Sequence, residues 1–131
     1  MSYLKNKSEI NRLAADLLQK QSFYPSVIHC AYYSCIQLMK HLMLNKLGKT
    51  EIDIVNEVRN STNGTHEVMI NSIIMYLKLS NKDWKTFNTN INQLKRLRVS
   101  ADYENIEIDS TKGSQSISLT DLIIKHLNSN I

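Results

Sequence analysis

Residues 25–47 read PSVIHCAYYSCIQLMKHLMLNKL, and this stretch decides the fold. Its one proline, Pro25, stands at the first position, where a helix tolerates a missing backbone N–H. Gly48 follows the stretch and can take the left-handed conformation in which helices commonly end. A helix of about 22 residues would be roughly 33 Å long. Because apolar residues occupy more than one of its sides, we expect a buried central helix that contacts several neighbours.

Apolar residues at spacings of three and four predict further helices on both sides of this one. We expect them at about residues 3–19, 51–59, 65–79 and 84–103, with a short final helix from about residue 118. The first has most apolar side chains on one side (Leu4, Ile10, Leu13, Ala14, Leu17, Leu18), and the 51–59 helix has Ile52, Val55 and Val58 at threefold spacing.

The predicted ends of these helices depend on short polar signals. Thr50 with Asp53, and Ser118 with Asp121, have the spacing of a box that caps a helix start. Residues 104–116 are polar and contain Gly113, so they predict a long connection.

Length and composition predict a single all-α domain over residues 1–131. Three glycines and one proline are too few for an all-β fold, which needs turns at short intervals. Residues 1–10 lack the apolar run of a signal peptide, and polar side chains interrupt residues 27–47, so we expect no membrane segment. Cys30 and Cys35 would lie about 8 Å apart on one helix, too far for a disulfide, which favours reduced thiols in a cytoplasmic protein.

The charge pattern permits a polyanion as a partner. The net charge is +4, which suits RNA but falls short of the balance of a dedicated DNA-binding domain. Lys82, Lys85, Lys95 and Arg96 lie on the outer face of the 84–103 helix, where they either follow a phosphate backbone or form a solvated face. The four histidines (His29, His41, His66, His126) lack the spacing of metal ligands, and no cofactor motif is present, so we predict no metal and no cofactor.

Arg98 is the residue that departs from its helical pattern. The apolar positions Trp84, Phe87, Ile91 and Leu94 are followed in register by Arg98. An arginine there is either buried with a partner or directed toward an interface or cleft. Asp102 lies one turn later, so a simple ion pair within the helix is the alternative. Tyr103 either stacks on a base or is a core aromatic whose hydroxyl reaches the surface.

Three short motifs occur in a fixed order along the chain. They are AYYS at residues 31–34, His66 at the start of a later helix, and RVSADY at residues 98–103. In this order they resemble the HEPN family of small helical domains associated with nucleic acids, over about residues 10–127. The resemblance implies a homodimeric up-and-down bundle of four to five helices, often encoded beside a nucleotidyltransferase. It also implies that many relatives are ribonucleases or toxins that need no metal.

The chain departs from the motif of the family's nucleases. In that motif an arginine is followed after four to six residues by a histidine, and two copies meet across the dimer. Arg98 matches the arginine, but Tyr103 stands five residues later and no histidine follows in range. A phenol is a poor proton-transfer group near neutral pH. The motif therefore does not decide between an enzyme and a binding domain.

Three functional hypotheses follow. The first is a homodimeric HEPN-like domain that binds RNA or a nucleotide, as part of a toxin–antitoxin pair, with Tyr33, Arg98, Asp102 and Tyr103 lining a cleft between subunits. The adjacent Tyr32 and Tyr33 point about 100° apart, so one belongs to the core and the other to the cleft or interface. The second is a non-catalytic interaction module that holds a partner such as a nucleotidyltransferase. A weak ribonuclease that uses Tyr103 or His66 is a third possibility.

Overall fold

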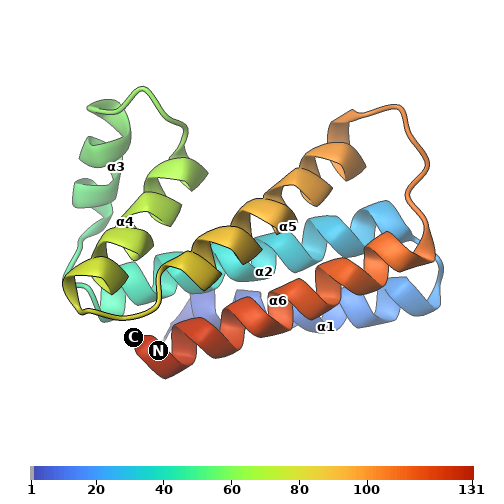
Figure 1. Ribbon diagram of the computed structural model, residues 1–131, viewed down its shortest axis with the longest axis horizontal. Coiled ribbons are helices and arrows are strands. Elements are labelled where there is room, and N and C mark those ends of the chain that lie inside the picture. The colour runs from blue at the N-terminus through green and yellow to red at the C-terminus, as the bar shows by residue number, and fades with distance from the viewer. Residues whose placement is uncertain (1) are drawn as a thin grey trace.

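The computed structural model describes residues 2–131, and this part of the chain is all-α, as predicted. The helices are α1 (Tyr3–Lys20), α2 (Tyr24–Asn45), α3 (Glu51–Arg59), α4 (Thr65–Leu79), α5 (Lys85–Tyr103) and α6 (Ser110–Asn130). In Figure 1 the long helices α1, α2 and α6 run along the molecule, α5 crosses α2 and α6 obliquely, and α3 and α4 form a shorter hairpin at one end. Residues 2–131 therefore form six helices, whereas the family resemblance implies four to five.

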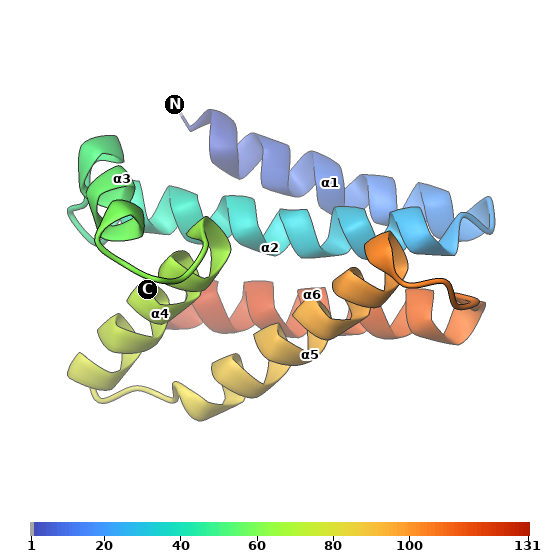
Figure 2. The ribbon, with the colours of Figure 1, turned by 90° about the horizontal axis from the view of Figure 1, so that it is seen from above.

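The central position of α2 agrees with the sequence. It packs against α1, α4, α5 and α6, and Figure 2 shows it between α1 on one side and α5 and α6 on the other. Pro25 lies in its first turn, and Gly48 takes a left-handed φ of 70° three residues after its end at Asn45. Its buried residues are Val27, Ile28, Ala31, Tyr32, Ser34, Cys35, Ile36, Leu38, Met39, Leu42 and Met43.

The predicted inner face of α1 is wrong for three of its six apolar residues. Ile10, Leu13 and Leu17 are 56–64 % exposed, whereas Ser8 and Ala15 are buried. The helix packs on α2 through these small side chains, since Ala15 contacts Val27 and Ala31 in a small cluster of its own. Small residues at a contact allow two helix axes to come closer together. Leu18 packs partly buried on the same cluster, whereas Ile10, Leu13 and Leu17 face away from the bundle.

The predicted inner face of α3 is also wrong. Thr50 and Asp53 form the expected capping box, but Ile54 is the buried residue, and Ile52 and Val55 are 71 % and 50 % exposed. Because α3 is short, packs mainly on α4 and pairs Glu51 with Lys40 of α2 at 3.1 Å, one buried position is enough to anchor it.

The predicted start of α6 at Ser118 is wrong as well. The helix begins at Ser110, and the side chain of Asp109 caps it by accepting from the Lys112 N–H. Gly113 is buried inside this helix, where a Cβ would collide with the Gln19 side chain of α1. The glycine that suggested a loop therefore permits a close approach of two helices.

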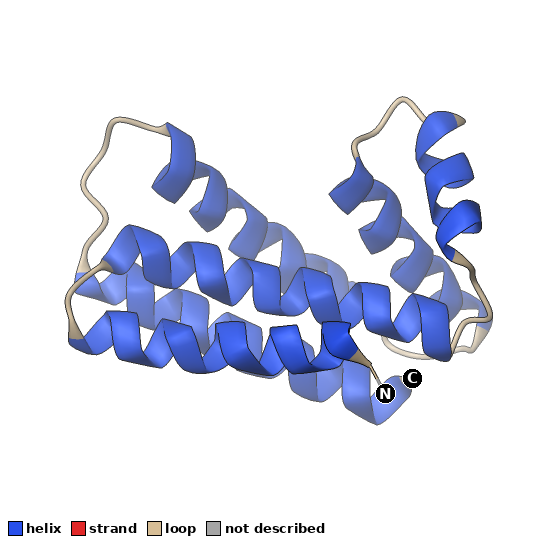
Figure 3. Cartoon of the chain, turned by 180° about the vertical axis from the view of Figure 1, so that it is seen from behind, coloured by secondary structure: helices blue, strands red, loops and turns tan. Residues whose placement is uncertain are grey.

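The hairpin of α3 and α4 marks one end of the molecule. Both ends of the described chain lie at that same end (Figure 3).

Within residues 2–131, none of the helices combines the length and the apolar character needed to cross a membrane.

Candidate functional site

Arg98 of α5 lies among aromatic rings. Its side chain is 14 % exposed, and its Cζ lies 5.3–5.6 Å from the ring centroids of Tyr32, Tyr33 and Tyr103. These distances are typical of attraction between a cation and the face of an aromatic ring. Nη2 donates to the hydroxyl of Tyr33 at 3.2 Å and to that of Tyr103 at 3.5 Å. Arg98 is therefore held inward by three tyrosines from two helices.

Asp102 links this arginine to a histidine of α2. Its Oδ2 lies 3.0 Å from Nε of Arg98, although the Nε–H is not aligned for a hydrogen bond. The Nδ1 of His29 lies 3.0 Å and 3.2 Å from the two carboxylate oxygens. Burial opposes the charged form of Arg98, but Tyr33, Tyr103 and Asp102 outweigh it and raise the pKa of Arg98. The ion pair within the helix exists, but Asp102 also contacts the imidazole of His29 rather than Arg98 alone.

A second imidazole reaches the same cluster from the start of α4. The Nδ1 of His66 lies 3.1 Å from the hydroxyl of Tyr32, and its ring centroid lies 5.5 Å from those of Tyr32 and Tyr33. Burial lowers the pKa of His66, and the charges of Arg98 and Lys95 lower it further. Burial also raises the pKa of Tyr32 to about 12. At neutral pH the phenol thus donates to a neutral imidazole.

The structure brings together the four residues that the sequence nominated. Tyr33, Arg98, Asp102 and Tyr103 lie in one cluster, with Tyr32 fully buried beneath them. Sequence reasoning missed His29, because it weighed the histidines for metal-ligand spacing and only His66 as a catalytic residue. A usable signal was present: His29 stands four residues before Tyr33, so both lie on one face of the same helix.

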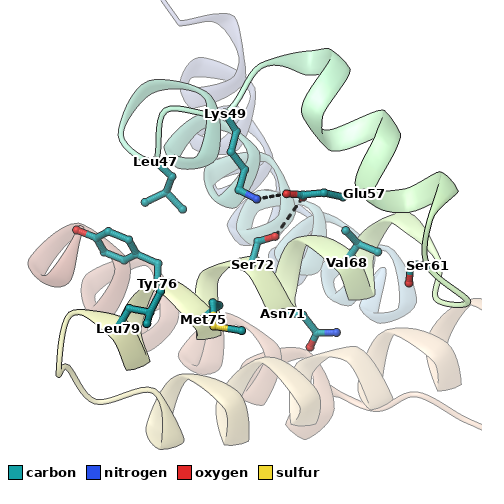
Figure 4. A pocket seen from close by; sticks show the side chains of 10 residues that line it. All are labelled: Leu47, Lys49, Glu57, Ser61, Val68, Asn71, Ser72, Met75, Tyr76 and Leu79. Carbon is teal, nitrogen blue, oxygen red and sulfur yellow. Dashed lines mark hydrogen bonds and ion pairs between the residues drawn. The ribbon is translucent and has the colours of Figure 1, made fainter.

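A separate hollow lies away from this cluster. It has a volume of about 470 Å³ and is lined by α3, α4 and the segment after α2, including Leu47, Val68 and Met75. Figure 4 shows Lys49 and Ser72 both pointing toward Glu57 at its edge. None of the Arg98 cluster lines this hollow. The cluster, here called the Arg98 patch, lies only partly at the surface, because Tyr103 is 72 % exposed while the Arg98 side chain is 14 % exposed. The predicted cleft would require a second subunit.

The patch has the chemistry of an anion site. Among residues 2–131, no three His, Cys, Asp or Glu side chains come together as a ligand set for a metal ion. Arg98 instead offers the forked donors that match phosphate oxygens, and the 72 % exposed Tyr103 offers a ring beside them. In comparisons with known proteins, the chain matches no protein-family model, no curated protein and no solved structure.

Proposed function

We propose that the chain forms a homodimeric, HEPN-like domain that binds the phosphate of RNA or of a nucleotide at Arg98. One observation carries this proposal: the guanidinium is largely buried, yet its hydrogen-bonding capacity is incompletely used. Within the described residues only Nη2 donates hydrogen bonds, and the buried Nε finds no aligned acceptor. A partly buried guanidinium with free donors favours an acceptor that arrives from outside.

The surroundings of Arg98 fit a nucleotide better than a bare anion. Tyr103 is 72 % exposed and the side chain of His29 is 50 % exposed. Flat rings beside a phosphate-binding arginine can stack on a nucleobase whatever its identity. The net charge of +4 adds a general attraction for a polyanion.

The basic residues just before α5 and on its outer face support the proposed RNA binding only in part. Lys95 pairs with Glu67 at 2.5 Å, and Lys82 donates to the backbone carbonyl of Asn130. Both amines are thus occupied within the protein, while Arg96 is exposed. Binding is therefore proposed to centre on Arg98 and not on a continuous row of lysines.

Exposed apolar residues support a dimer across the same patch. Val99, Tyr103 and Ile106 are 38 %, 72 % and 50 % exposed, and they lie at or just after the end of α5, beside Arg98. Exposed apolar patches often mark an interface. A twofold axis through this surface would place two Arg98 side chains opposite each other, because such an interface uses the same patch of both subunits. The paired patches would form the predicted cleft.

Binding of a single-stranded oligoribonucleotide to the wild type and to Arg98→Ala tests the proposal. We expect the affinity of Arg98→Ala to fall by about tenfold or more, because hydrogen bonds between charged groups contribute about 1.5–3 kcal/mol each. Arg96→Ala is the matched control, since it removes an exposed arginine of the same helix. It should change the affinity by less than about threefold. Equal affinities of the wild type and Arg98→Ala would remove the proposal.

The second candidate function is an interaction module, and the exposed face of α1 favours it. Ile10, Leu13 and Leu17 form an apolar stripe that no part of the described chain covers. In this alternative the stripe holds a partner such as a nucleotidyltransferase, as in a toxin–antitoxin pair, and Arg98 is only structural. Retention of a co-expressed partner by Arg98→Ala, together with its loss in Leu13→Glu, would favour the module.

A further inference from the structure

The chain contains one asparagine that is followed by glycine, and this pair lies in the loop between α3 and α4. The pair is Asn63–Gly64, whereas the other two glycines follow Leu47 and Lys112. Both residues of the pair are exposed, at the tip of the hairpin in Figure 1. The backbone nitrogen after an asparagine can attack the carbon of its carboxamide, and glycine obstructs this approach least because it has no Cβ. The pair therefore has the chemistry of spontaneous deamidation.

The hydrogen bonds of the loop leave both reacting groups free. The backbone N–H of Asn63 donates to the hydroxyl of Ser61 at 2.9 Å, and the carbonyl of Gly64 accepts from the N–H of Val68 at 3.1 Å. Between these two fixed points, neither the carboxamide of Asn63 nor the N–H of Gly64 has a partner within residues 2–131. The two groups can therefore approach each other without breaking a hydrogen bond.

The other asparagine of this loop is placed differently. Asn60 is exposed like Asn63, but the residue after it is Ser61, whose Cβ hinders the approach. The N–H of Ser61 also donates to the carbonyl of Val58 at 3.2 Å. At Asn60 the attacking nitrogen is thus both hindered and occupied, so this residue is an internal control for Asn63.

Gly64 can be replaced without strain. Its φ of −74° and ψ of 172° are ordinary for any residue, and an added Cβ would meet no atom within 4 Å. The other glycines differ, since Gly48 has a left-handed φ of 70° and a Cβ on Gly113 would collide with Gln19. An alanine at position 64 therefore changes the access to Asn63 and keeps the backbone of the loop.

We propose that Asn63 is a site of spontaneous deamidation in the folded protein. The backbone nitrogen of Gly64 forms a bond to Cγ of Asn63, and the bond from Cγ to the side-chain nitrogen breaks. That nitrogen leaves as ammonia with the proton from the N–H of Gly64, and a five-membered cyclic imide remains. Water then adds to one of the two imide carbonyls and opens the ring to isoaspartate or aspartate. In sum, one water is consumed, one ammonia is released and a carboxylate replaces the amide.

The new carboxylate would stand directly before the start of α4. Gly64 is the N-cap of this helix and supplies no side-chain cap, so a negative charge beside it is favourable. Isoaspartate, in addition, lengthens the backbone by one methylene group at this point. His66, the second residue of α4, contacts Tyr32 and Tyr33 beneath Arg98. The reaction therefore changes the charge and the backbone at the start of a helix that contributes to the Arg98 patch.

The test follows every asparagine of the folded, full-length protein during incubation in a mildly alkaline buffer, because the attacking nitrogen must lose its proton. Peptide mapping by mass spectrometry detects the replacement of the amide group by a hydroxyl group, and chromatography separates isoaspartate from aspartate. We expect Asn63 to be converted first, and Asn60 more slowly by about tenfold or more. Gly64→Ala should slow the conversion of Asn63 by about tenfold or more, because its Cβ obstructs the attack.

Two controls complete the design. Asn63→Gln should resist conversion at position 63, since its longer side chain would have to close a six-membered ring. Thermal melting of each protein after incubation shows that the reaction took place in the folded state. A synthetic peptide of residues 58–68 gives the rate of the same sequence without the fold.

Three results would overturn the proposal. The first is conversion of Asn60 as fast as that of Asn63, and the second is undiminished conversion in Gly64→Ala. The third is an intact Asn63 in the folded protein after the peptide has been converted, because the native loop would then prevent closure of the ring. None of these measurements depends on the binding of RNA, so they test the deamidation site independently of the proposed function.

Discussion

Ser8 of α1 and Ser34 of α2 exchange hydrogen bonds across the interface of their helices. The hydroxyl of Ser8 donates to the backbone carbonyl of Ser34 at 2.6 Å, and the hydroxyl of Ser34 donates to the carbonyl of Ser8 at 2.8 Å. Both side chains are buried, with exposures of 4 % and 0 %. This reciprocal pair joins α1 to α2 where large apolar residues are absent.

Ser34→Ala should therefore lower the free energy of unfolding by about 1 kcal/mol, the net contribution of one buried hydrogen bond. Urea titration measures this loss. Ser129→Ala removes an exposed hydroxyl near the end of α6 and should change the stability by less than about 0.5 kcal/mol. If the pair is coupled, Ser8→Ala combined with Ser34→Ala costs less than the sum of the single losses. Strict additivity would show that the two hydroxyls act independently.

The start of α6 can be located by substitution. Asp109→Ala should destabilise the protein by about 1 kcal/mol, because it removes the acceptor that caps the first turn. Ser118→Ala lies in the middle of the helix at an exposed position and should be nearly neutral. Chemical denaturation of both variants measures the difference. The opposite ranking would mean that the helix begins at Ser118.

Stability should depend on pH through His66. Its pKa is lowered in the folded protein, chiefly by burial, so the unfolded chain takes up a proton first as the pH falls. Folding is therefore favoured at neutral pH and loses stability as the pH falls below about 6.5, the ordinary value for histidine. The unfolding free energy of the wild type should fall more than that of His66→Gln between about pH 7.5 and about pH 5.5. The lowered pKa of His41 contributes equally to both proteins, and equal losses would contradict the prediction for His66.

The oligomeric state should depend on the end of α5. Val99→Glu places a charge in the exposed apolar surface beside Arg98, and we expect it to convert a dimer to a monomer. Leu13→Glu places a charge in the apolar stripe of α1 instead, and we expect it to leave the dimer intact. Sedimentation or light scattering measures both. If only Leu13→Glu dissociates the dimer, the α1 stripe is the interface between subunits, and the Arg98 patches do not meet.

Sequence patterns predicted the helices whose contacts are apolar. The central, buried position of α2 was predicted from the apolar side chains on several of its faces, between Pro25 and Gly48. The first two turns of α6 were not predicted, because their contacts with α1 are made by small and polar side chains. Gln19 of α1, for example, donates to the backbone carbonyl of Ser110 and to the hydroxyl of Ser114. Such residues have the composition of a loop until their partners on neighbouring elements are known.

In α1 and in the candidate site, too, the sequence pattern along one helix does not show which contacts that helix makes with other elements. Periodicity shows that Ile10, Leu13 and Leu17 share a face, but not whether their own chain covers it. It also places Arg98 on the inner stripe of α5 with Asp102 one turn later. The contact between Asp102 and His29 joins positions 73 residues apart, and helical spacing relates only residues of the same helix. Sequence alone therefore nominates the arginine and misses its histidine neighbour.

The depth of Cys35 in α2 gives the protein a natural conformational probe. Its side chain has no exposed surface, and burial raises the pKa of the thiol to about 12. A thiol reagent can therefore modify Cys35 only when the helices around α2 separate, and the rate of labelling would follow that opening. Since α2 also carries His29 and Tyr33, slower labelling in the presence of RNA would reveal ligand-induced stiffening of the scaffold without any introduced dye.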